Sequence, residues 1–354
     1  MKILYGIQGT GHGHISRARV VLPKLREYAE VDVLVSGYNF KMNIDGEIAY
    51  KVRGISLAYD NNGSVDMLET ALNLHPIKFI QDVQAIPIDD YDFVVNDFEP
   101  VTAWAANGAG MPCVAISHQA SFLSDKAPRP AKKSLVAEQV MKHFAPCTAA
   151  VGSHYLRYDD FIEPPIIRRQ IRNLNPALGD HITVYLPAFD HETLCSIFQQ
   201  VQKVEWHIFS PNCEDAYTKG NVKVHPVGKE TFLESIESCL GIVSATGFET
   251  TSEAMFLGKK LLTIPIKNQY EQLCNAAALT ELGGKVVYQI DQHFQQTLSD
   301  WIDEGAVLTL PEISDEEDLV QKIISAGMCG TASKEGQREK AGVLQRSVAH
   351  SVSL

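Results

Sequence analysis

The sequence predicts an α/β protein made of two Rossmann-like, doubly wound halves that face each other across a cleft. The chain has 354 residues, enough for two domains that each bury a core. Short β-branched runs alternate with helical stretches along it, which is the βαβ pattern of parallel sheets. A proline-containing stretch near residue 165 separates one such series from the next.

The first half is expected to span residues 1–165. Its predicted strands are apolar runs of the kind that fill a parallel sheet covered on both faces: KILYGI, VDVLVS, DFVVND, PCVAIS and CTAAVG. Its predicted helices cover residues 14–28, 65–86, 103–107 and 135–144.

Residues 166–180 are the predicted linker, and the second half is expected to span residues 181–329. Its predicted strands are ITVYLPAF, VEWHIFS, CLGIVSA, KKLLTIP and KVVYQI. Its predicted helices cover residues 191–201, 232–238, 250–257 and 272–282. Residues 330–354 are rich in Ser, Gly, Lys, Gln and Ala, which predicts a surface extension.

Charge and hydropathy exclude several classes of partner. Lys plus Arg total 31 against 43 Asp plus Glu, a formal charge of -12 that opposes binding to nucleic acid. A basic cluster at Lys126, Arg129, Lys132 and Lys133 allows at most peripheral membrane contact, and a solvated helix start is the simpler interpretation. No run reaches the ~20 apolar residues of a spanning helix, and the N-terminal one is too short for a signal peptide, so a cytoplasmic location is expected.

A glycine-rich loop, GIQGTGHGHISRA, follows the first predicted strand. Gly9, Gly11 and Gly13 let the backbone approach an anion or a sugar at the start of the next helix. A dinucleotide cofactor would need a GxGxxG loop and an acidic residue closing the second strand. That strand closes on Ser36 and Gly37, so NAD is disfavoured and no cofactor is predicted.

Two histidines, His12 and His14, lie where this loop turns into a helix. The helix dipole disfavours an imidazolium there, so a neutral imidazole remains available to accept a proton near neutral pH. His14 is therefore the predicted general base toward an acceptor hydroxyl. The alternative is a histidine that only caps the helix or hydrogen-bonds the turn.

Ser117, His118 and Gln119 follow another predicted strand, at the edge where open α/β sheets bind their ligands. His118 is the second candidate for the base, or else an acceptor contact. Asp97 and Glu99 lie at the same edge. Either can orient a histidine, although capping of the following helix is the favoured interpretation.

The strongest signal is SATGFETTSEAMFLGKKLLTIPIKNQYEQLCNAAAL in the second half. At Gly247–Thr250 a strand passes into a helix, which offers backbone donors to a diphosphate. One turn later Glu253 can accept hydrogen bonds from two ribose hydroxyls. Glu271, Gln272 and Asn275 open the next helix, where they can reach the hydroxyls of a sugar.

In order and spacing, these pieces resemble the GT-B glycosyltransferases, in particular family 28, the group with the peptidoglycan N-acetylglucosaminyltransferase and the glycolipid galactosyltransferases. The resemblance covers the chain to about residue 330. It rests on a GxxTxSE-like stretch, a strand ending in proline and an acidic-Gln pair before NA, here Gly247, Thr250, Ser252, Glu253, Pro265, Glu271, Gln272, Asn275 and Ala276.

The resemblance implies a role for each matched residue. The implied donor contacts are Gly247, Phe248, Glu249 and Thr250 along the phosphates, Glu253 on the ribose, Val227 at the nucleobase, and Glu271, Gln272 and Asn275 toward the transferred sugar. The acidic Glu249 is expected to turn its side chain away from the phosphates. The implied acceptor contacts are Gly9, Thr10, Gly11, His12, Gly13 and Arg17, and His14 matches the histidine of the family.

The implied activity is transfer of a sugar from a nucleotide diphosphate donor, UDP by default, to a carbohydrate, lipid-linked or small-molecule acceptor. Transfer is expected to invert the anomeric centre and to need no metal, because the carboxylate clusters lie in loops or at helix starts. Two alternatives stay open. One is a nucleotide-sugar 2-epimerase or hydrolase of the same fold, and the other is a protein that binds a nucleotide sugar without catalysis.

Overall fold

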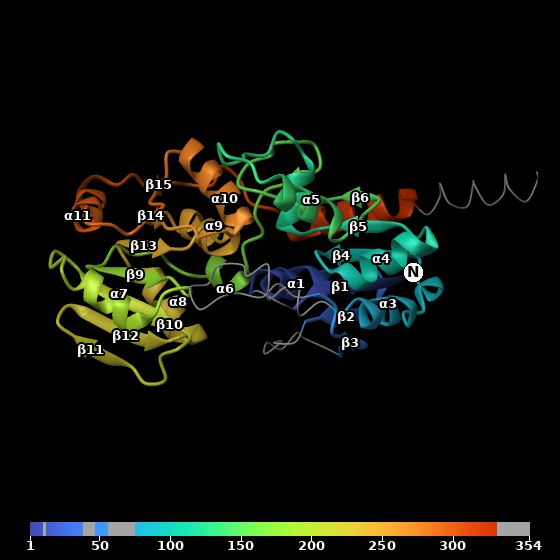
Figure 1. The fold of residues 1–354 in the computed structure, drawn as a ribbon, viewed down its shortest axis with the longest axis horizontal. Coiled ribbons are helices and arrows are strands. Elements are labelled where there is room, and N and C mark those ends of the chain that lie inside the picture. Colours follow the sequence, from blue (N-terminus) through green and yellow to red (C-terminus); the bar gives the residue numbers. More distant parts are fainter. Residues whose placement is uncertain (10–11, 38–46, 56–74, 331–354) are drawn as a thin grey trace, which may run out of the picture.

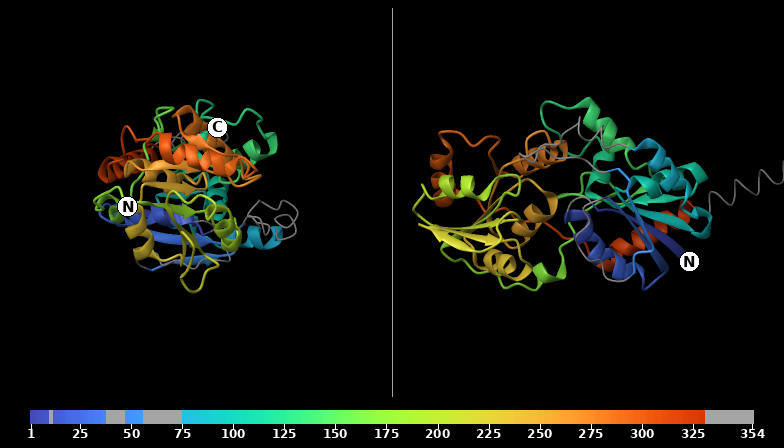
Figure 2. Two further views of the ribbon diagram at one scale, coloured as in Figure 1. Left: turned by 90° about the vertical axis from the view of Figure 1, so that its left-hand side faces the viewer. Right: turned by 60° about the horizontal axis from the view of Figure 1, so that its bottom comes forward.

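The computed structural model describes residues 1–9, 12–37, 47–55 and 75–330, which form two larger sheets and their covering helices (Figure 1). The elements of the first half lie at one end of the long axis and those of the second half at the other (Figure 2). The predicted arrangement of two doubly wound halves is confirmed. No described helix is long and apolar enough to cross a lipid bilayer.

The first sheet has six parallel strands in the order β3-β2-β1-β4-β5-β6. These are β1 (Lys2–Gln8), β2 (Glu30–Ser36), β3 (Tyr50–Val52), β4 (Phe93–Asp97), β5 (Cys113–Ala115) and β6 (Ala149–Ala150). The helical segments are α1 (His12–Leu25), α3 (Pro76–Gln84), η1 (Ile88–Asp90), α4 (Pro100–Ala109), η2 (His118–Leu123) and α5 (Leu135–His143). Every residue of β4 is buried, as expected of a central strand covered on both faces.

The second sheet has seven strands in the order β11-β12-β10-β9-β13-β14-β15, all parallel except β11. They are β9 (His181–Tyr185), β10 (Glu205–Ser210), β11 (Tyr217–Lys219), β12 (Val222–Pro226), β13 (Gly241–Ser244), β14 (Lys260–Thr263) and β15 (Lys285–Val286). The helices are α7 (His191–Phe198), α8 (Lys229–Ser238), α9 (Phe248–Phe256), α10 (Tyr270–Glu281) and α11 (Phe294–Glu304). A short parallel pair, β7 (Gly152–Ser153) and β8 (Ile162–Glu163), and α6 (Arg169–Arg172) connect the halves.

Both sheets reverse their strand order at a central point. In the first, the chain winds outward from β1 to β3, then returns to place β4 on the other side of β1. In the second, β9, β10 and β12 wind outward and β13 returns beside β9. Ligands of open α/β sheets bind at the carboxyl ends of the strands beside such a reversal. His14, Asp97 and Gly247 all lie just beyond or at those strand ends.

The last described helix, over residues 316–330, returns to the first half. Leu319, Val320 and Ile323 belong to the same buried core as Phe93 and Val95 of β4. In Figure 1 this red helix lies among the elements of the first sheet. The division of the chain into two domains, residues 1–165 and 181–329, with a linker over residues 166–180, stays a prediction. We propose that the helix over residues 316–330 belongs to the first domain. Residues 331–354, most of the predicted extension, lie outside the described residues.

Several predicted elements differ from the structure. Only Lys285–Val286 of the predicted strand KVVYQI forms a strand. The predicted helix over residues 65–86 is described only from residue 75, where α3 covers Pro76–Gln84. Helix α11 was missed because its sequence, FQQTLSDWIDE, is largely polar. Its four buried residues, Phe294, Leu298, Trp301 and Ile302, recur every three or four positions and bury one side of the helix.

Lys259 fixes the linker to the second half. Its side chain is 1% exposed, and its Nζ donates hydrogen bonds to the backbone carbonyls of Ala177, Glu237 and Cys239 at 2.6, 2.7 and 2.8 Å. The three carbonyls satisfy the three donors of the ammonium group. The amine therefore joins the linker to the C-terminal end of α8.

Candidate active site

His14 and Asp97 meet where the neighbouring strands β1 and β4 end. The Nδ1 atom of His14 lies 2.7 Å from Oδ1 of Asp97, and the two residues are only 8% and 0% exposed. Because a carboxylate accepts the proton of Nδ1, the other ring nitrogen, Nε2, carries the lone pair. Nε2 has no hydrogen-bond partner among the described residues. The pair has the geometry of a base oriented by a carboxylate.

Arg17 holds the other side of the same carboxylate. Its Nε donates to Oδ2 of Asp97 at 2.8 Å, and its second terminal nitrogen, NH2, donates to Oδ1 at 3.1 Å. Burial alone would raise the pKa of Asp97, but the charge of Arg17 and the hydrogen bond from His14 outweigh burial and lower the pKa to about 2. Asp97 is therefore ionised at neutral pH. Arg17 is 5% exposed, and its expected contact with the acceptor stays a prediction.

The turn between β4 and α4 separates the roles of two carboxylates. Glu99 caps α4, because its side chain accepts hydrogen bonds from the backbone N–H groups of Val101 and Thr102 at 2.7 Å each. Asp97 instead faces His14. Phe98 between them has a φ of 54°, a left-handed conformation that is costly for a non-glycine residue, and its ring stacks on His14 at 6.4 Å. This turn lets neighbouring carboxylates point to different partners.

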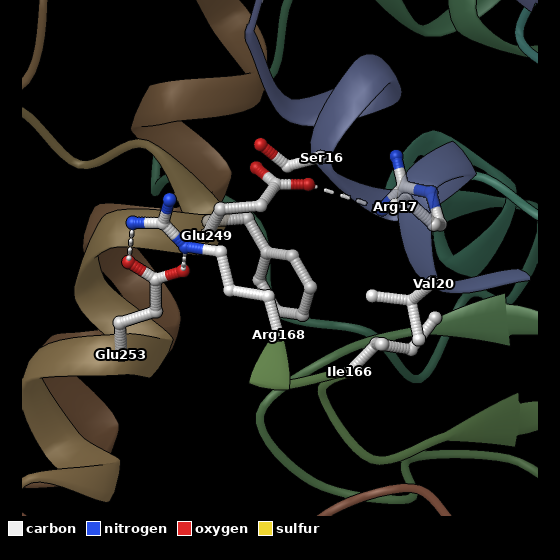
Figure 3. A pocket seen from close by; sticks show the side chains of 8 residues that line it. Ser16, Arg17, Val20, Ile166, Arg168, Glu249 and Glu253 are labelled. Atoms are coloured by element: carbon white, nitrogen blue, oxygen red, sulfur yellow. Dashed lines mark hydrogen bonds and ion pairs between the residues drawn. The ribbon is translucent and has the colours of Figure 1, made fainter. Parts of the chain in front are cut away.

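Two ion pairs connect helix α9 of the second half to α1 of the first half and to the linker (Figure 3). The first terminal nitrogen of Arg17, NH1, donates to Oε1 of Glu249 at 3.1 Å. Arg168, from the linker, donates from Nε to Oε1 of Glu253 at 2.6 Å and from NH2 to Oε2 at 3.0 Å. The cavity between these pairs holds only about 10 Å³, the space of roughly one water molecule. A nucleotide sugar does not fit inside it.

The N-terminus of α9 lies open beside this cavity. Gly247 is its N-cap, and no side chain in the part of the chain that the structure describes caps the helix. Apart from its chain neighbours, no heavy atom of the described residues lies within 4 Å of a Cβ atom placed on Gly247, so no other described element packs against this N-cap. The first backbone N–H groups, at Phe248 to Thr250, are therefore available to an anion.

His118 is buried between the two halves. Its Nδ1 lies 2.7 Å from the carbonyl oxygen of Ser153, and its Nε2 lies 2.7 Å from Oδ1 of Asn275 on α10. Its ring stacks on that of Phe248 with centroids 4.0 Å apart. Because both ring nitrogens are engaged and the residue is 1% exposed, His118 could act as a base only after losing one of these contacts.

The residues at the start of α10 contact other parts of the protein. Gln119 of the first half donates to Oε2 of Glu271 at 2.7 Å. The Oε1 atom of Gln272 accepts from the backbone N–H of Ile266 at 2.9 Å, and Asn275 donates to the carbonyl of Thr246 at 3.0 Å. These side chains hold the loops around the carboxyl ends of β13 and β14. Their expected contacts with the sugar stay predictions.

Other predicted site residues are placed less fully. Gly9 donates its backbone N–H to the carbonyl of Ser36 at 2.7 Å, beside the end of β1. Thr10 and Gly11 lie outside the described residues, and His12 is the first residue of α1. Val227 is 45% exposed on the loop between β12 and α8. Among the described residues, no group of three or more His, Cys, Asp or Glu side chains is arranged to hold a metal ion.

The family model described as glycosyl transferase family 1 matches residues 1–304. The chain belongs to glycosyl transferase family 1. No curated protein matches this glycosyltransferase in sequence. The GT-B fold and the glycosyltransferase activity expected from the sequence are confirmed.

Solved structures of low sequence identity share the fold of this glycosyltransferase. A glycosyltransferase from Streptomyces nogalater is 17% identical with a TM-score of 0.52, covering 93% of this chain and 95% of its own. A UDP-glucosyltransferase from Polygonum tinctorium is 13% identical with a TM-score of 0.55, covering 94% of both chains. MurG from Acinetobacter baumannii is 13% identical with a TM-score of 0.52, covering 92% and 94%.

Arg168 of this glycosyltransferase is a site residue that was not predicted from the sequence. The feature that could have indicated it is the pair Arg168–Arg169 in a linker otherwise rich in proline and isoleucine. Only the tertiary structure brings Arg168 onto Glu253, 85 residues away.

Proposed function

We propose that the protein transfers a sugar from a nucleoside diphosphate to an acceptor hydroxyl with inversion at the anomeric carbon. The observation that carries this proposal is the pair of His14 and Asp97, 2.7 Å apart, with Nε2 of His14 left as a proton acceptor. This pair belongs to the first half, while the open helix end at Gly247 belongs to the second.

In the proposed reaction, Nε2 of His14 takes the proton of the acceptor hydroxyl while its oxygen attacks the anomeric carbon. The bond from that carbon to the diphosphate oxygen breaks, and the electron pair leaves with the nucleoside diphosphate. The N-terminal N–H groups of α9 stabilise the negative charge of the leaving group, and Asp97 stabilises the imidazolium. We propose that no metal takes part. Full activity in excess chelator would support this, and strict dependence on added Mg²⁺ or Mn²⁺ would refute it.

The donor is proposed to lie along α9 and the start of α10. Gly247, Phe248, Glu249 and Thr250 begin the helix that would receive the phosphates, and Val227 lies exposed where a nucleobase would pack. Because Arg168 donates one hydrogen bond to each oxygen of Glu253, the ribose hydroxyls would either share this carboxylate with the guanidinium or displace it. Beyond the phosphates, Glu271, Gln272 and Asn275 are proposed to approach the sugar. UDP is the first candidate, since a structural neighbour is a UDP-glucosyltransferase.

The acceptor is proposed to bind on the loop from Gly9 to Gly13, against His14. Its class is a carbohydrate, lipid-linked or small-molecule hydroxyl compound. Helix α5, beside η2, favours a membrane-borne acceptor because no residue of α5 is buried, and Leu135 and Val136 are 80% and 63% exposed.

Exposed lysines stand just before α5 and in its last turn: Lys132, Lys133 and Lys142. Apolar side chains flanked by cations match the interface of an anionic bilayer. We propose peripheral contact with such a surface and no nucleic-acid partner.

Donor binding tests the proposal first. Thermal unfolding is measured with UDP, GDP, dTDP and CMP, because a ligand at a hundred times its dissociation constant stabilises a protein by about 2.7 kcal/mol. We expect UDP to raise the midpoint and Glu253→Ala to abolish the shift. The matched control is Glu304→Ala, an exposed carboxylate at the end of α11. No shift with any nucleotide, in folded protein, would overturn the proposal.

A second measurement separates transfer from the alternatives. UDP-glucose is incubated with the protein, with and without a panel of hydroxyl acceptors, and UDP release is followed. Release that rises with an acceptor and disappears in His14→Ala supports transfer. Equal consumption without acceptor would indicate an epimerase or a hydrolase, and tight binding without turnover under any condition would indicate a sensor.

A further inference from the structure

Arg17 connects carboxylates from the two halves of the molecule. It lies on α1, binds Asp97 at the end of β4 through two nitrogens, and binds Glu249 of α9 through a third. Arg17 and Asp97 are 5% and 0% exposed, so solvent screens their interaction little. Glu249 is 232 positions from Arg17 in the sequence.

Two nitrogens of the planar Arg17 guanidinium, Nε and NH2, form a fork that fixes the plane of the Asp97 carboxylate. Nε binds Oδ2 at 2.8 Å and NH2 binds Oδ1 at 3.1 Å, so both oxygens are held by one rigid group. Oδ1 is also the atom that meets Nδ1 of His14. Without the fork, the carboxylate could rotate about its terminal bond and lose its alignment with His14.

The start of α1 is shaped to receive Glu249. A Cβ atom on Gly13 would lie 2.5 Å from Oε2 of Glu249, closer than real Cβ contacts. Glycine at this position therefore lets the carboxylate of α9 reach Arg17. The side chain of Glu249 points across to the first half, as Figure 3 shows, and not along the N-terminus of its own helix.

We propose that Arg17 is a positioning residue, which orients Asp97 toward His14 and is itself fixed by Glu249, so that approach of the two halves sets the base. This inference rests on the proposed role of His14 as the base. Its physical basis is that a carboxylate held in one orientation fixes the tautomer of its histidine and supports the imidazolium that forms during transfer.

The charges around His14 predict that replacing Arg17 and replacing Glu249 change the protonation of the His14 ring in opposite directions. Asp97 and Glu249 carry negative charge and Arg17 positive charge, while burial raises the pKa of the nearby Tyr5 well above its usual value and keeps it neutral. Removing the cation favours protonation of the His14 ring, whereas removing the Glu249 anion disfavours it. A residue with only a packing role would not move the His14 titration in this way.

The test is the pH titration of the His14 ring signals in protein labelled at histidine, assigned by their loss in His14→Gln. We expect the His14 ring to be protonated more readily in Arg17→Met than in the parent, and less readily in Glu249→Gln. In the double variant Arg17→Met/Glu249→Gln, the two opposite effects should partly cancel, because a cation and an anion are removed together. Unmoved titrations, or shifts in the same direction, would overturn the inference.

Two further variants keep the test decisive if Arg17→Met does not fold. Arg17→Lys keeps the charge but loses the fork, so UDP release from UDP-glucose should fall roughly tenfold or more while the titration stays close to that of the parent. Gly13→Ala leaves every charge in place but displaces Glu249, and it should move the titration in the same direction as Glu249→Gln. Parent-like behaviour of both variants would overturn the inference.

The control is Arg129→Lys, which changes an arginine whose side chain is 6% exposed and binds Glu138 at 2.7 Å, not Asp97 or Glu249. It should leave the His14 titration unchanged. UDP binding, measured by thermal shift, separates this inference from the proposed function. Absence of UDP binding by the parent protein removes the proposed function, whereas failure of the Arg17 inference appears in the titrations and in the turnover of Arg17→Lys while the parent still binds UDP.

Discussion

The Nδ1 atom of His14 lies 2.7 Å from the Oδ1 atom of Asp97, although 83 positions separate the two residues. The contact forms because β1 and β4 are neighbours at the point where the strand order of the first sheet reverses. His14 follows the end of one strand and Asp97 closes the other. A base and its orienting carboxylate are therefore supplied by the topology of the sheet.

Asp97→Asn is expected to lower turnover by about 10²–10⁴-fold while the fold and the donor affinity stay intact. An amide can hydrogen-bond His14 but carries no charge to stabilise the imidazolium. The measurement is UDP release from UDP-glucose, with UDP affinity measured in parallel. Asp89→Asn, an exposed carboxylate in η1, is the control. Turnover of Asp97→Asn near that of the parent would remove Asp97 from the mechanism.

His154 is expected to make the protein less stable in acid. It is fully buried among aromatic rings, and burial lowers its pKa well below the usual value. The unfolded chain therefore binds a proton below about pH 6.5 that the folded protein does not. Stability then falls as the pH drops through 6.5, by at most about 1.4 kcal/mol per pH unit from this residue.

The measurement is the midpoint of thermal unfolding between pH 7.5 and 5.5. His154→Asn keeps an acceptor for the backbone N–H of Tyr155 but cannot titrate, so its midpoint should depend less on pH. His143→Asn, at an exposed histidine of α5, should retain the pH dependence of the parent. Identical pH dependence in the parent and His154→Asn would contradict the prediction.

Lys259→Met is expected to lower the free energy of unfolding by about 3 kcal/mol or more, because three backbone carbonyls lose their donor. The measurement is unfolding in urea. The control is Lys267→Met at an exposed lysine, which should change stability by less than about 0.5 kcal/mol. A small loss in Lys259→Met would mean that water replaces the ammonium group.

Leu135→Ser/Val136→Ser is expected to weaken binding to anionic phosphatidylglycerol vesicles by tenfold or more. Each side chain would otherwise bury apolar surface worth about 1.5–3 kcal/mol in the bilayer interface. The measurement is co-sedimentation with vesicles. Leu178→Ser, at a linker leucine that is 75% exposed, should bind like the parent. Absence of vesicle binding by the parent would end the membrane proposal.

Local patterns predicted the central strands of both sheets and most helices, but not β3, β11 and β12. Runs such as DFVVND are apolar because they are covered on both faces, and the structure has β4 over Phe93–Asp97 with every residue buried. The glycine-rich turn after β1 and the strand-to-helix junction at Gly247 were also readable, because glycine and chain direction are local features. The polar α11 was missed, and β15 is shorter than the predicted strand, because neighbouring elements, and not local sequence, decide those segments.

By itself, the sequence determined two α/β halves, a histidine at the start of α1 and a helix end suited to phosphate in the second half. It left the choice between Asp97 and Glu99 open, because both carboxylates follow the same strand. Only the tertiary structure decided it: the left-handed turn at Phe98 points Glu99 toward the start of α4, and Asp97 toward His14 and Arg17.

The contacts from Arg17 to Glu249 and from Arg168 to Glu253 could not be predicted from the sequence either. The residues of these pairs are 232 and 85 positions apart and meet only in the folded protein.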